Sequence, residues 1–119
     1  MRYNKTELGR KGERLAREYL TSRGFIIVAH NFRCRFGEID LIARKEKAFR
    51  FIEVKFRTGT EYGLPQESVV RRKQQKIRTT AMLWLKQRCL PVDSEIHFDV
   101  LAINEEQGKI KYNYIEDAF

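Results

Sequence analysis

The chain has 119 residues, 42% of them hydrophobic and 12% aromatic, and its 24 Lys and Arg against 16 Asp and Glu give a formal charge of +8. This length and composition suffice for one domain with its own core, which argues against wholesale disorder. Two cysteines, the lack of an apolar leader and the lack of any apolar run of about 18 residues argue against a secreted disulfide scaffold and a membrane span, and favour the cytoplasm.

The first predicted element is an amphipathic helix. Apolar and small residues recur there at helical spacing, with a candidate N-cap at Thr6 and a helix end at Gly24. The residues of this apolar stripe are Leu8, Gly12, Leu15, Ala16, Tyr19 and Leu20. We therefore expect the helix to pack one face against the rest of the domain.

Three β-prone segments follow, at residues 25–32, 36–44 and 48–57. A loop is predicted over residues 58–65, which contain two glycines and a proline. The second and third segments are joined by too few residues for a crossover connection. We therefore expect them to form an antiparallel hairpin.

The longest helix is predicted from residue 66 or 67 to residue 88, and Pro91 closes this element. Its buried face should carry Val70, Ile77, Ala81 and Trp84. Two more strands, at residues 95–103 and 109–115, should flank a turn at residues 104–108.

This order of elements predicts an α/β fold with a mixed β-sheet flanked by helices. No linker or repeat divides the chain, so residues 1–119 are expected to form a single domain with a core of about residues 6–115.

The register of the hairpin follows if Glu46 and Lys47 form a two-residue turn, because residues whose numbers sum to 93 then lie opposite one another. One face then pairs Ile39 with Val54 and Leu41 with Ile52, and the other pairs Glu38 with Lys55, Asp40 with Glu53 and Ile42 with Phe51. Both faces carry large apolar residues, as expected for a sheet covered on two sides.

The pair of Asp40 and Glu53 is unusual on such a sheet, since two opposed carboxylates repel and are destabilising when partly buried unless a cation lies between them. Mg²⁺ is commonly held by one or two carboxylates together with substrate phosphate oxygens. Lys55 lies on the same face and could activate a water or stabilise charge on a phosphate. The alternative is a neutralised salt-bridge patch at an exposed sheet end that also includes Glu38, because the short Asp…Glu-x-Lys pattern is common.

Positive charge is concentrated in the second predicted helix, where residues 71–78 include Arg71, Arg72, Lys73, Lys76 and Arg78 and no acid. Such a run favours contact with a phosphate backbone, and a solvated helix face is the alternative. The charge of the whole chain favours an anionic partner but does not separate nucleic acid from a membrane surface.

Cys34 and Cys89 are predicted to be ordinary thiols, because they lie far apart and lack the paired spacing of a structural zinc site. A zinc site that combines them with His30 and His97 is the alternative, although only His30 and Cys34 are closely spaced.

Two blocks of the sequence resemble the bacterial YraN family. They are Gly37-Glu38-Ile39-Asp40-Leu41-Ile42-Ala43 and Phe51-Ile52-Glu53-Val54-Lys55-Phe56-Arg57. The resemblance covers about residues 8–103 and includes Gly12-Glu13, Asn31-Phe32-Arg33 and Phe98-Asp99-Val100. That family is similar to archaeal Holliday-junction resolvases and belongs to the restriction endonuclease-like PD-(D/E)XK superfamily.

The resemblance implies a restriction endonuclease-like fold and a Mg²⁺- or Mn²⁺-dependent endonuclease that hydrolyses DNA phosphodiester bonds, including those of branched or junction DNA. Asp40, Glu53 and the backbone carbonyl of Val54 would bind the metal, and Lys55 would serve catalysis. Glu13 would reach in from the first helix as a further catalytic or metal-binding acid. A surface ion pair with Arg10 or Arg17 is the alternative for Glu13.

Other transfers from the resemblance are weaker. Lys73 and Gln74 lie where the superfamily often places a phosphate contact, and Arg57 is a further phosphate contact near the site. His97 stands where the family has Arg before Phe-Asp-Val, so a role for this position is not transferred. Asp99 is interpreted as a buried structural acceptor rather than a ligand.

Two classes of function stay open: a DNA endonuclease, and a non-catalytic module that binds nucleic acid, DNA rather than RNA, on the same fold. A third, a protein scaffold, is supported only by Tyr112, Tyr114 and Phe119, which core packing explains more simply. No membrane partner is expected. By analogy with resolvases that act symmetrically on a junction, a homodimer is expected.

Overall fold

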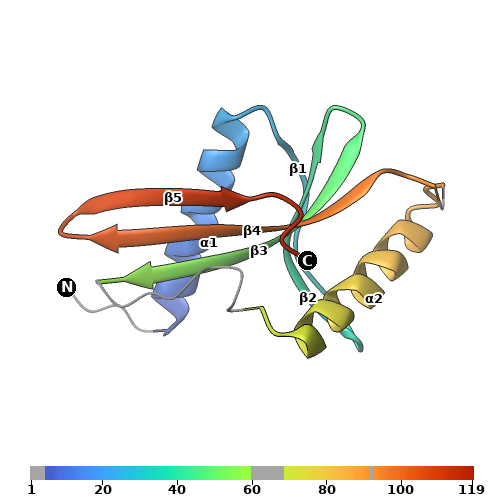
Figure 1. Cartoon of the computed structure of the whole chain (residues 1–119), viewed down its shortest axis with the longest axis horizontal. Helices are drawn as coiled ribbons and strands as arrows, with labels where there is room; N and C mark the ends of the chain where they lie inside the picture. Colours follow the sequence, from blue (N-terminus) through green and yellow to red (C-terminus); the bar gives the residue numbers. More distant parts are fainter. Residues whose placement is uncertain (1–4, 60–68, 92) are drawn as a thin grey trace.

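The computed structural model describes residues 5–59, 69–91 and 93–119, which form two helices and one five-stranded sheet (Figure 1). In chain order the elements are α1 Lys5–Ser22, β1 Ile26–Cys34, β2 Gly37–Lys45, β3 Ala48–Thr58, α2 Arg71–Gln87, β4 Ile96–Glu106 and β5 Lys109–Ile115. The predicted α/β class is confirmed.

The strands lie in the order β1-β2-β3-β4-β5 across the sheet. Neighbouring strands are antiparallel, except that β3 and β4 are parallel. A parallel pair needs a long crossover connection, and here that connection contains α2. The prediction of a mixed sheet flanked by helices is therefore confirmed.

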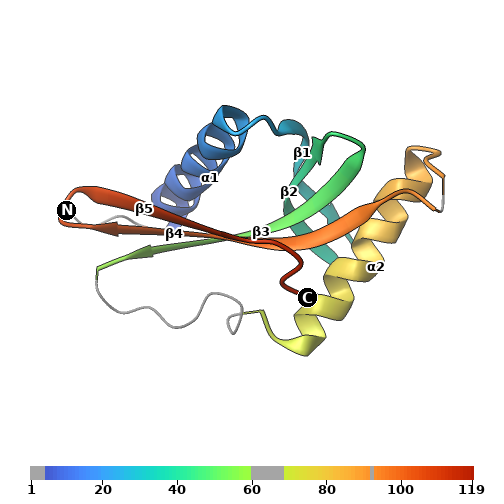
Figure 2. The ribbon, with the colours of Figure 1, turned by 45° about the horizontal axis from the view of Figure 1, so that its top comes forward.

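The two helices cover opposite faces of the sheet (Figure 2). The core on the α1 side includes Leu15, Leu20, Leu41, Ile52, Leu101 and Ile103, and the core on the α2 side includes Ile39, Phe51, Ile77, Trp84 and Val100. Leu41 and Ile42 of β2, like Ile52 and Phe51 of β3, enter different cores, because successive side chains of a strand point to opposite faces. Ile39 packs in the α2-side core although it lies two residues from Leu41, so the alternation is not kept between these two residues of β2. This arrangement explains why both faces of the hairpin are apolar.

Gly12 allows α1 to approach β3 closely. A Cβ atom added at Gly12 would lie 2.8 Å from the Cβ atom of Phe56, whereas one added at Gly9 would have no other atom within 4 Å. Any larger residue at position 12 would therefore push the helix away from the strand. The close approach brings Glu13 to the same pocket as Val54 and Lys55 of β3.

The helix α2 begins later than predicted, and with 17 residues it is shorter than the 18-residue α1, so the prediction that it is the longest helix is wrong. Val70 has extended backbone angles and stands as the N-cap, and its side chain is 62% exposed, so its predicted place on the buried face is wrong. Val69 is buried instead, with 2% of its surface exposed. The other three predicted core residues of this helix, Ile77, Ala81 and Trp84, are buried as predicted.

The remaining boundaries differ from the predictions by a few residues. β4 continues to Glu106, so the turn before β5 shortens to Gln107 and Gly108, both with positive φ. The final strand spans residues 109–115 as predicted. The side chain of Thr6, most of the predicted loop at 58–65 and the predicted helix start at 66 or 67 lie outside the described residues. Within the described ranges, neither helix is long and apolar enough to span a membrane.

Candidate active site

The hairpin of β2 and β3 has the predicted register over its turn end. Lys45 lies opposite Ala48, and the pairing continues until Leu41 lies opposite Ile52. Glu46 has a φ of 57°, a left-handed angle that the two-residue turn requires. The alternation of side chains between the two faces therefore predicted the register of β2 and β3 correctly in this part of the sheet.

Beyond Leu41 and Ile52 the two strands separate. β2 stays paired with β1, whereas β3 stays paired with β4 as far as Thr58. Figure 1 shows β1 and β2 turning away from the long arm formed by β3, β4 and β5. The predicted direct pairs of Ile39 with Val54, Asp40 with Glu53 and Glu38 with Lys55 are wrong, because the ladder has ended before these residues.

The side chain of Asp40 lies in the fork between the strands. Its Oδ2 atom accepts a hydrogen bond of 2.8 Å from the backbone N–H of Val54. If the ladder of β2 and β3 continued to this point, a main-chain carbonyl of β2 would accept the Val54 N–H instead. Because the N–H and C=O of one strand residue point to the same edge, the Val54 carbonyl also faces the fork. A carboxylate and a carbonyl oxygen therefore share this edge of β3.

Glu53 is buried next to this fork, with 6% of its surface exposed. Its Oε1 atom lies 2.5 Å from Nζ of Lys73 on α2 and 3.7 Å from Nζ of Lys55. A buried carboxylate needs such partners, because removing it from water without compensation is costly. The two lysines compensate the charge of Glu53.

Electrostatic coupling connects the groups of this site. Burial, followed by the negative charge of Glu53, raises the pKa of Asp40 to about 7. Burial, followed by the positive charge of Lys73, lowers the pKa of Lys55. A carboxyl group with a raised pKa beside an amine with a lowered pKa is a combination that clusters at functional sites.

A pocket of about 490 Å³ opens at the fork, between α1 and the outer edge of β3. Asp40, Val54 and Lys55 line it, and Glu53 lies buried beside Lys55. Its other charged lining residues are Arg10, Glu13, Arg33, Glu38 and Arg57. The predicted site residues of three elements therefore meet at one cavity.

Glu13 lines this pocket but has partners on β1. Its carboxylate accepts a hydrogen bond of 2.9 Å from the Asn31 amide and lies 3.0 Å from Nδ1 of His30. Arg17, one of the two ion-pair partners considered, is 4.0 Å away. The contacts with His30 and Asn31 were missed from sequence reasoning, although Asn31 stands in a block that carries the family resemblance.

The predicted nucleic-acid contacts of α2 divide into two groups. Lys73 is held by Glu53, and the Gln74 amide donates a hydrogen bond of 2.8 Å to the carbonyl of Val69. Arg71, Arg72 and Lys76 are exposed. A second pocket, of about 500 Å³, is lined by Lys73 and by residues that include Glu38, Arg72 and Lys76. Glu38 lines both pockets, so basic side chains lie on two sides of the fork.

The oxygen donors at the fork fit a hard divalent cation. Asp40, Glu53 and the Val54 carbonyl supply two carboxylates and one carbonyl, a set typical of Mg²⁺ sites that keep positions for water and phosphate. In the described part of the chain, no group of three His, Cys, Asp or Glu side chains is placed to hold a metal ion. A cation here would therefore depend on solvent and substrate for its remaining ligands.

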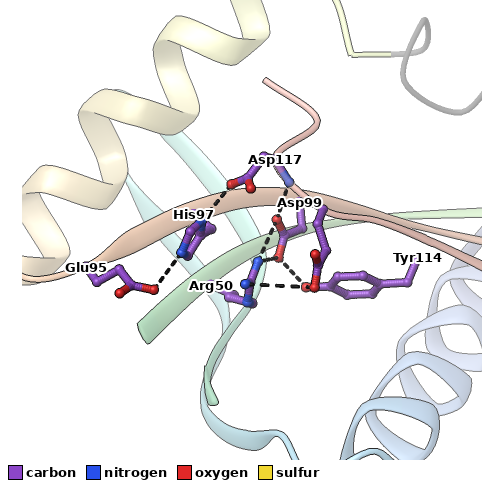
Figure 3. Close-up of polar contacts among 7 residues, drawn as sticks. Arg50, Glu95, His97, Asp99, Tyr114 and Asp117 are labelled. Atoms are coloured by element: carbon purple, nitrogen blue, oxygen red, sulfur yellow. Dashed lines mark hydrogen bonds and ion pairs between the residues drawn. The ribbon is translucent and has the colours of Figure 1, made fainter. Parts of the chain in front are cut away.

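Asp99 lies on β4 opposite Ile52 of β3, in a structural environment (Figure 3). It is fully buried, and its carboxylate accepts hydrogen bonds from the Arg50 guanidinium at 2.9 and 3.2 Å, from the Tyr114 hydroxyl and from the Asp117 backbone N–H. The interpretation as a buried acceptor is confirmed. His97 lies beside this cluster between Glu95 and Asp117, whose hydrogen bonds raise its pKa.

The residues of the alternative zinc site have separate partners. Sγ of Cys34 lies 3.6 Å from the Thr80 hydroxyl, and Cys89 is exposed. His30 contacts Glu13, and His97 contacts Glu95 and Asp117. The zinc alternative is therefore not supported.

Comparison with known proteins finds a family model described as "Uncharacterised protein family UPF0102", which matches residues 12–103. A UPF0102 protein of Syntrophomonas wolfei is 44% identical over 95% of this chain and 97% of its own length. Another, from Dictyoglomus turgidum, is 39% identical over 98% of this chain and 99% of its own. A third, from Nocardia farcinica, is 46% identical over 84% of this chain and 78% of its own. None of these descriptions names an activity.

Proposed function

The chain belongs to the UPF0102 family, and from its site we propose that it is a divalent-metal-dependent endonuclease that hydrolyses DNA phosphodiester bonds. The observation that carries the proposal is the fork of β2 and β3, where Asp40 and Lys55 line one pocket and the buried Glu53 lies beside Lys55. Two acids whose charges repel, such as Asp40 and Glu53, are unfavourable in a protein that only binds a phosphate backbone. They are useful in one that also binds a cation.

The proposed metal ligands are Asp40, Glu53 and the Val54 carbonyl. When bound, Mg²⁺ or Mn²⁺ would supply Lewis-acid polarisation of the phosphate and a nucleophilic water at neutral pH. The pKa of Asp40 is raised to about 7 by burial and by the charge of Glu53, so its carboxyl group would have to lose its proton when the ion binds. Glu53 would exchange its contact with Lys73 for the ion.

Lys55 is proposed to act at the phosphate. Its ammonium group is close to Glu53 and lines the pocket, and its pKa is lowered, so it can donate or accept a proton closer to neutrality than an exposed lysine. In the hydrolysis, water adds to phosphorus, the bond to the leaving oxygen breaks, and that oxygen takes a proton. Lys55 can stabilise the charge that develops on the phosphate oxygens.

The surrounding arginines and lysines are proposed to position the DNA. Arg57 is exposed and lines the first pocket, while Arg72 and Lys76 line the second. Arginine and lysine at these places would contact phosphates without reading bases. The proposed substrate is therefore recognised by backbone and shape, and branched DNA is the candidate substrate. For action on a four-way junction, we propose a homodimer.

A panel of DNA shapes tests this proposal. The full chain is incubated with Mg²⁺ or Mn²⁺ and with supercoiled, single-stranded and four-way-junction DNA, and divalent-ion binding is measured in parallel by calorimetry. We expect metal-dependent cleavage of at least one shape. A folded protein that binds the metal and cleaves none of them would contradict the proposal.

A second candidate is a module that binds nucleic acid without cleaving it. The contact of 2.5 Å between Lys73 and Glu53 favours it, since this ion pair can neutralise the buried acid without a metal. This candidate requires that the protein bind DNA and remain unaffected by divalent ions. It also requires that Asp40→Asn leave the affinity unchanged, while Arg71→Ala with Arg72→Ala weakens it uniformly across sequences.

A further inference from the structure

The arm of the sheet beyond the fork has two contrasting faces. On the α1 side, β3, β4 and β5 carry apolar and aromatic residues such as Phe56, Ile103 and Tyr112. The opposite face of the same three strands carries polar or small residues, because alternate positions point there. We name this opposite face the polar arm. It consists of Lys55, Arg57, Ala102, Asn104, Glu106, Lys109, Lys111 and Asn113.

The register places these residues in rows across the strands. Arg57 lies beside Asn104, and Asn104 lies beside Lys111. One row closer to the site, Lys55 lies beside Ala102, and Ala102 lies beside Asn113. The surface thus begins at Lys55 and continues outward without a break in the sheet.

The polar arm is basic and reaches solvent. Arg57, Lys109, Lys111 and Asn113 are exposed, and Lys55 is partly exposed. The arm has four basic residues and one acidic residue, Glu106. Four cations on a sheet face complement a phosphate backbone, and the exposed Asn113 amide can donate hydrogen bonds to phosphate oxygens.

We propose that the polar arm binds the phosphate backbone of duplex DNA that flanks the bond cleaved at the fork. The inference rests on the proposed nuclease function for its choice of DNA, and it adds Lys109, Lys111 and Asn113 to the interface. Neither the basic run of α2 nor the family resemblance pointed to these residues. Duplex DNA therefore extends from the pocket along β3, β4 and β5.

The dimensions of the polar arm suit a short piece of duplex. Three strands span about 10 Å, at roughly 4.8 Å between neighbours. Five residues along a strand span about 15 Å, at roughly 3.3 Å each. Duplex DNA rises about 3.4 Å per base pair, so the arm covers about four base pairs. This length accommodates a few phosphates, in keeping with the number of cations.

An alternative role for Lys109 and Lys111 follows from the position of β5 in the sheet. β5 is at the edge of the sheet, and edge strands often carry lysine to prevent pairing with another chain. That role predicts self-association when the lysines are replaced and no loss of affinity for DNA. The DNA-binding role predicts a monodisperse variant with weaker DNA binding.

The test compares two double variants that lose the same charge. Lys109→Gln with Lys111→Gln alters the polar arm, and Lys47→Gln with Lys86→Gln alters exposed lysines at the hairpin turn and in the last turn of α2. The affinity of each full-length protein for a 20-base-pair duplex is measured in EDTA at several salt concentrations, and sedimentation checks self-association.

We expect the polar-arm variant to lose at least about tenfold in affinity at 0.1 M salt, and the slope of log K against log salt to shrink by about one per lysine. The Lys47 and Lys86 control should lose less than about twofold. Equal losses in both variants, an unchanged polar-arm variant, or a loss seen with duplex RNA and not with DNA would overturn the inference.

Cleavage assays separate this inference from the proposed function. If the wild-type protein cleaves DNA and the polar-arm variant binds DNA as tightly as the control, the polar arm is rejected and the nuclease stands. If only the polar-arm variant loses affinity for DNA and the wild-type protein cleaves nothing, the nuclease is rejected and the DNA-binding surface stands.

Discussion

Lys73 on α2 and Glu53 on β3 form an ion pair, with 2.5 Å between Nζ and Oε1, at the fork where β2 leaves β3. Among the described residues, the pair joins the more basic of the two helices to the most buried glutamate. A divalent cation bound to this carboxylate, as proposed, would compete with Lys73 for the same oxygen.

Replacing Lys73 by Met should increase the affinity for Mn²⁺. The variant removes the ammonium group that a metal ion must displace. Because this group makes a charged hydrogen bond at a partly exposed site, its loss should raise the affinity for Mn²⁺ by several-fold to about tenfold. Electron paramagnetic resonance of free Mn²⁺ measures the change. Lys76→Met on the same helix is the matched control, because Lys76 is exposed. Equal Mn²⁺ affinities of the two variants would exclude the competition.

Asp40→Asn should stabilise the metal-free protein above neutral pH. The pKa of Asp40 is raised to about 7 from 3.8, so between about pH 4 and pH 7 the native state binds more protons than the unfolded state. The free energy of unfolding therefore falls as pH rises through this window. Asn keeps an oxygen that can accept the N–H of Val54 and has no charge to bury.

Urea denaturation in EDTA from pH 4 to pH 8 measures this effect. The wild-type protein should lose stability across the window, and the difference in favour of Asp40→Asn should grow towards pH 8, by on the order of 1–3 kcal/mol. Saturating Mg²⁺ should reverse the difference at pH 8, because only the wild-type site keeps both carboxylates. Parallel stability curves for the two proteins would contradict the burial of a charged Asp40.

Two glycines of α1 should respond oppositely to the same substitution. Gly9→Ala should stabilise the protein by about 0.5–1 kcal/mol, since alanine favours a helix and the added Cβ meets no other atom within 4 Å. Gly12→Ala should destabilise it by about 1–3 kcal/mol, because its Cβ would lie 2.8 Å from Cβ of Phe56. Thermal unfolding of the two variants measures these opposite changes in stability. Stabilisation by both substitutions would mean that α1 does not approach β3 as described.

Asp99→Ala should destabilise the fold by about 3–5 kcal/mol, because it leaves the Arg50 guanidinium without its buried partner. Tyr114→Phe removes one neutral donor to the same carboxylate and should cost about 1 kcal/mol. Chemical denaturation compares the two. A stable Asp99→Ala protein that no longer cleaves DNA would instead assign Asp99 to the active site.

The register of the hairpin could be predicted from the sequence because alternation fixes which residues share a face, and the turn at Glu46 and Lys47 fixes the offset. The residue at which the ladder of β2 and β3 ends could not be predicted in this way. It depends on one side chain, Asp40, accepting a hydrogen bond from the Val54 N–H that the main chain would otherwise bond, and the apolar pattern does not indicate this contact.

The contact of Lys73 with Glu53 could not be predicted from the sequence either. Basic residues predicted a phosphate-binding helix, but which lysine faces the sheet depends on where α2 begins. Propensity favoured an earlier start, whereas Val70 is extended and Val69 fills the core. Tertiary packing decided between the two valines, as it commonly does at helix ends.

The most direct test of the nuclease proposal measures metal-dependent DNA cleavage by four purified proteins: the wild type, Glu53→Gln, Lys55→Ala and the control Lys47→Gln. The proposed site predicts cleavage by the wild type and the control, none by Glu53→Gln, and a rate lower by about 10²–10⁴ in Lys55→Ala. Cleavage of equal rate in Glu53→Gln would identify a contaminating nuclease. No cleavage by a folded, metal-bound wild-type protein would contradict the proposed function.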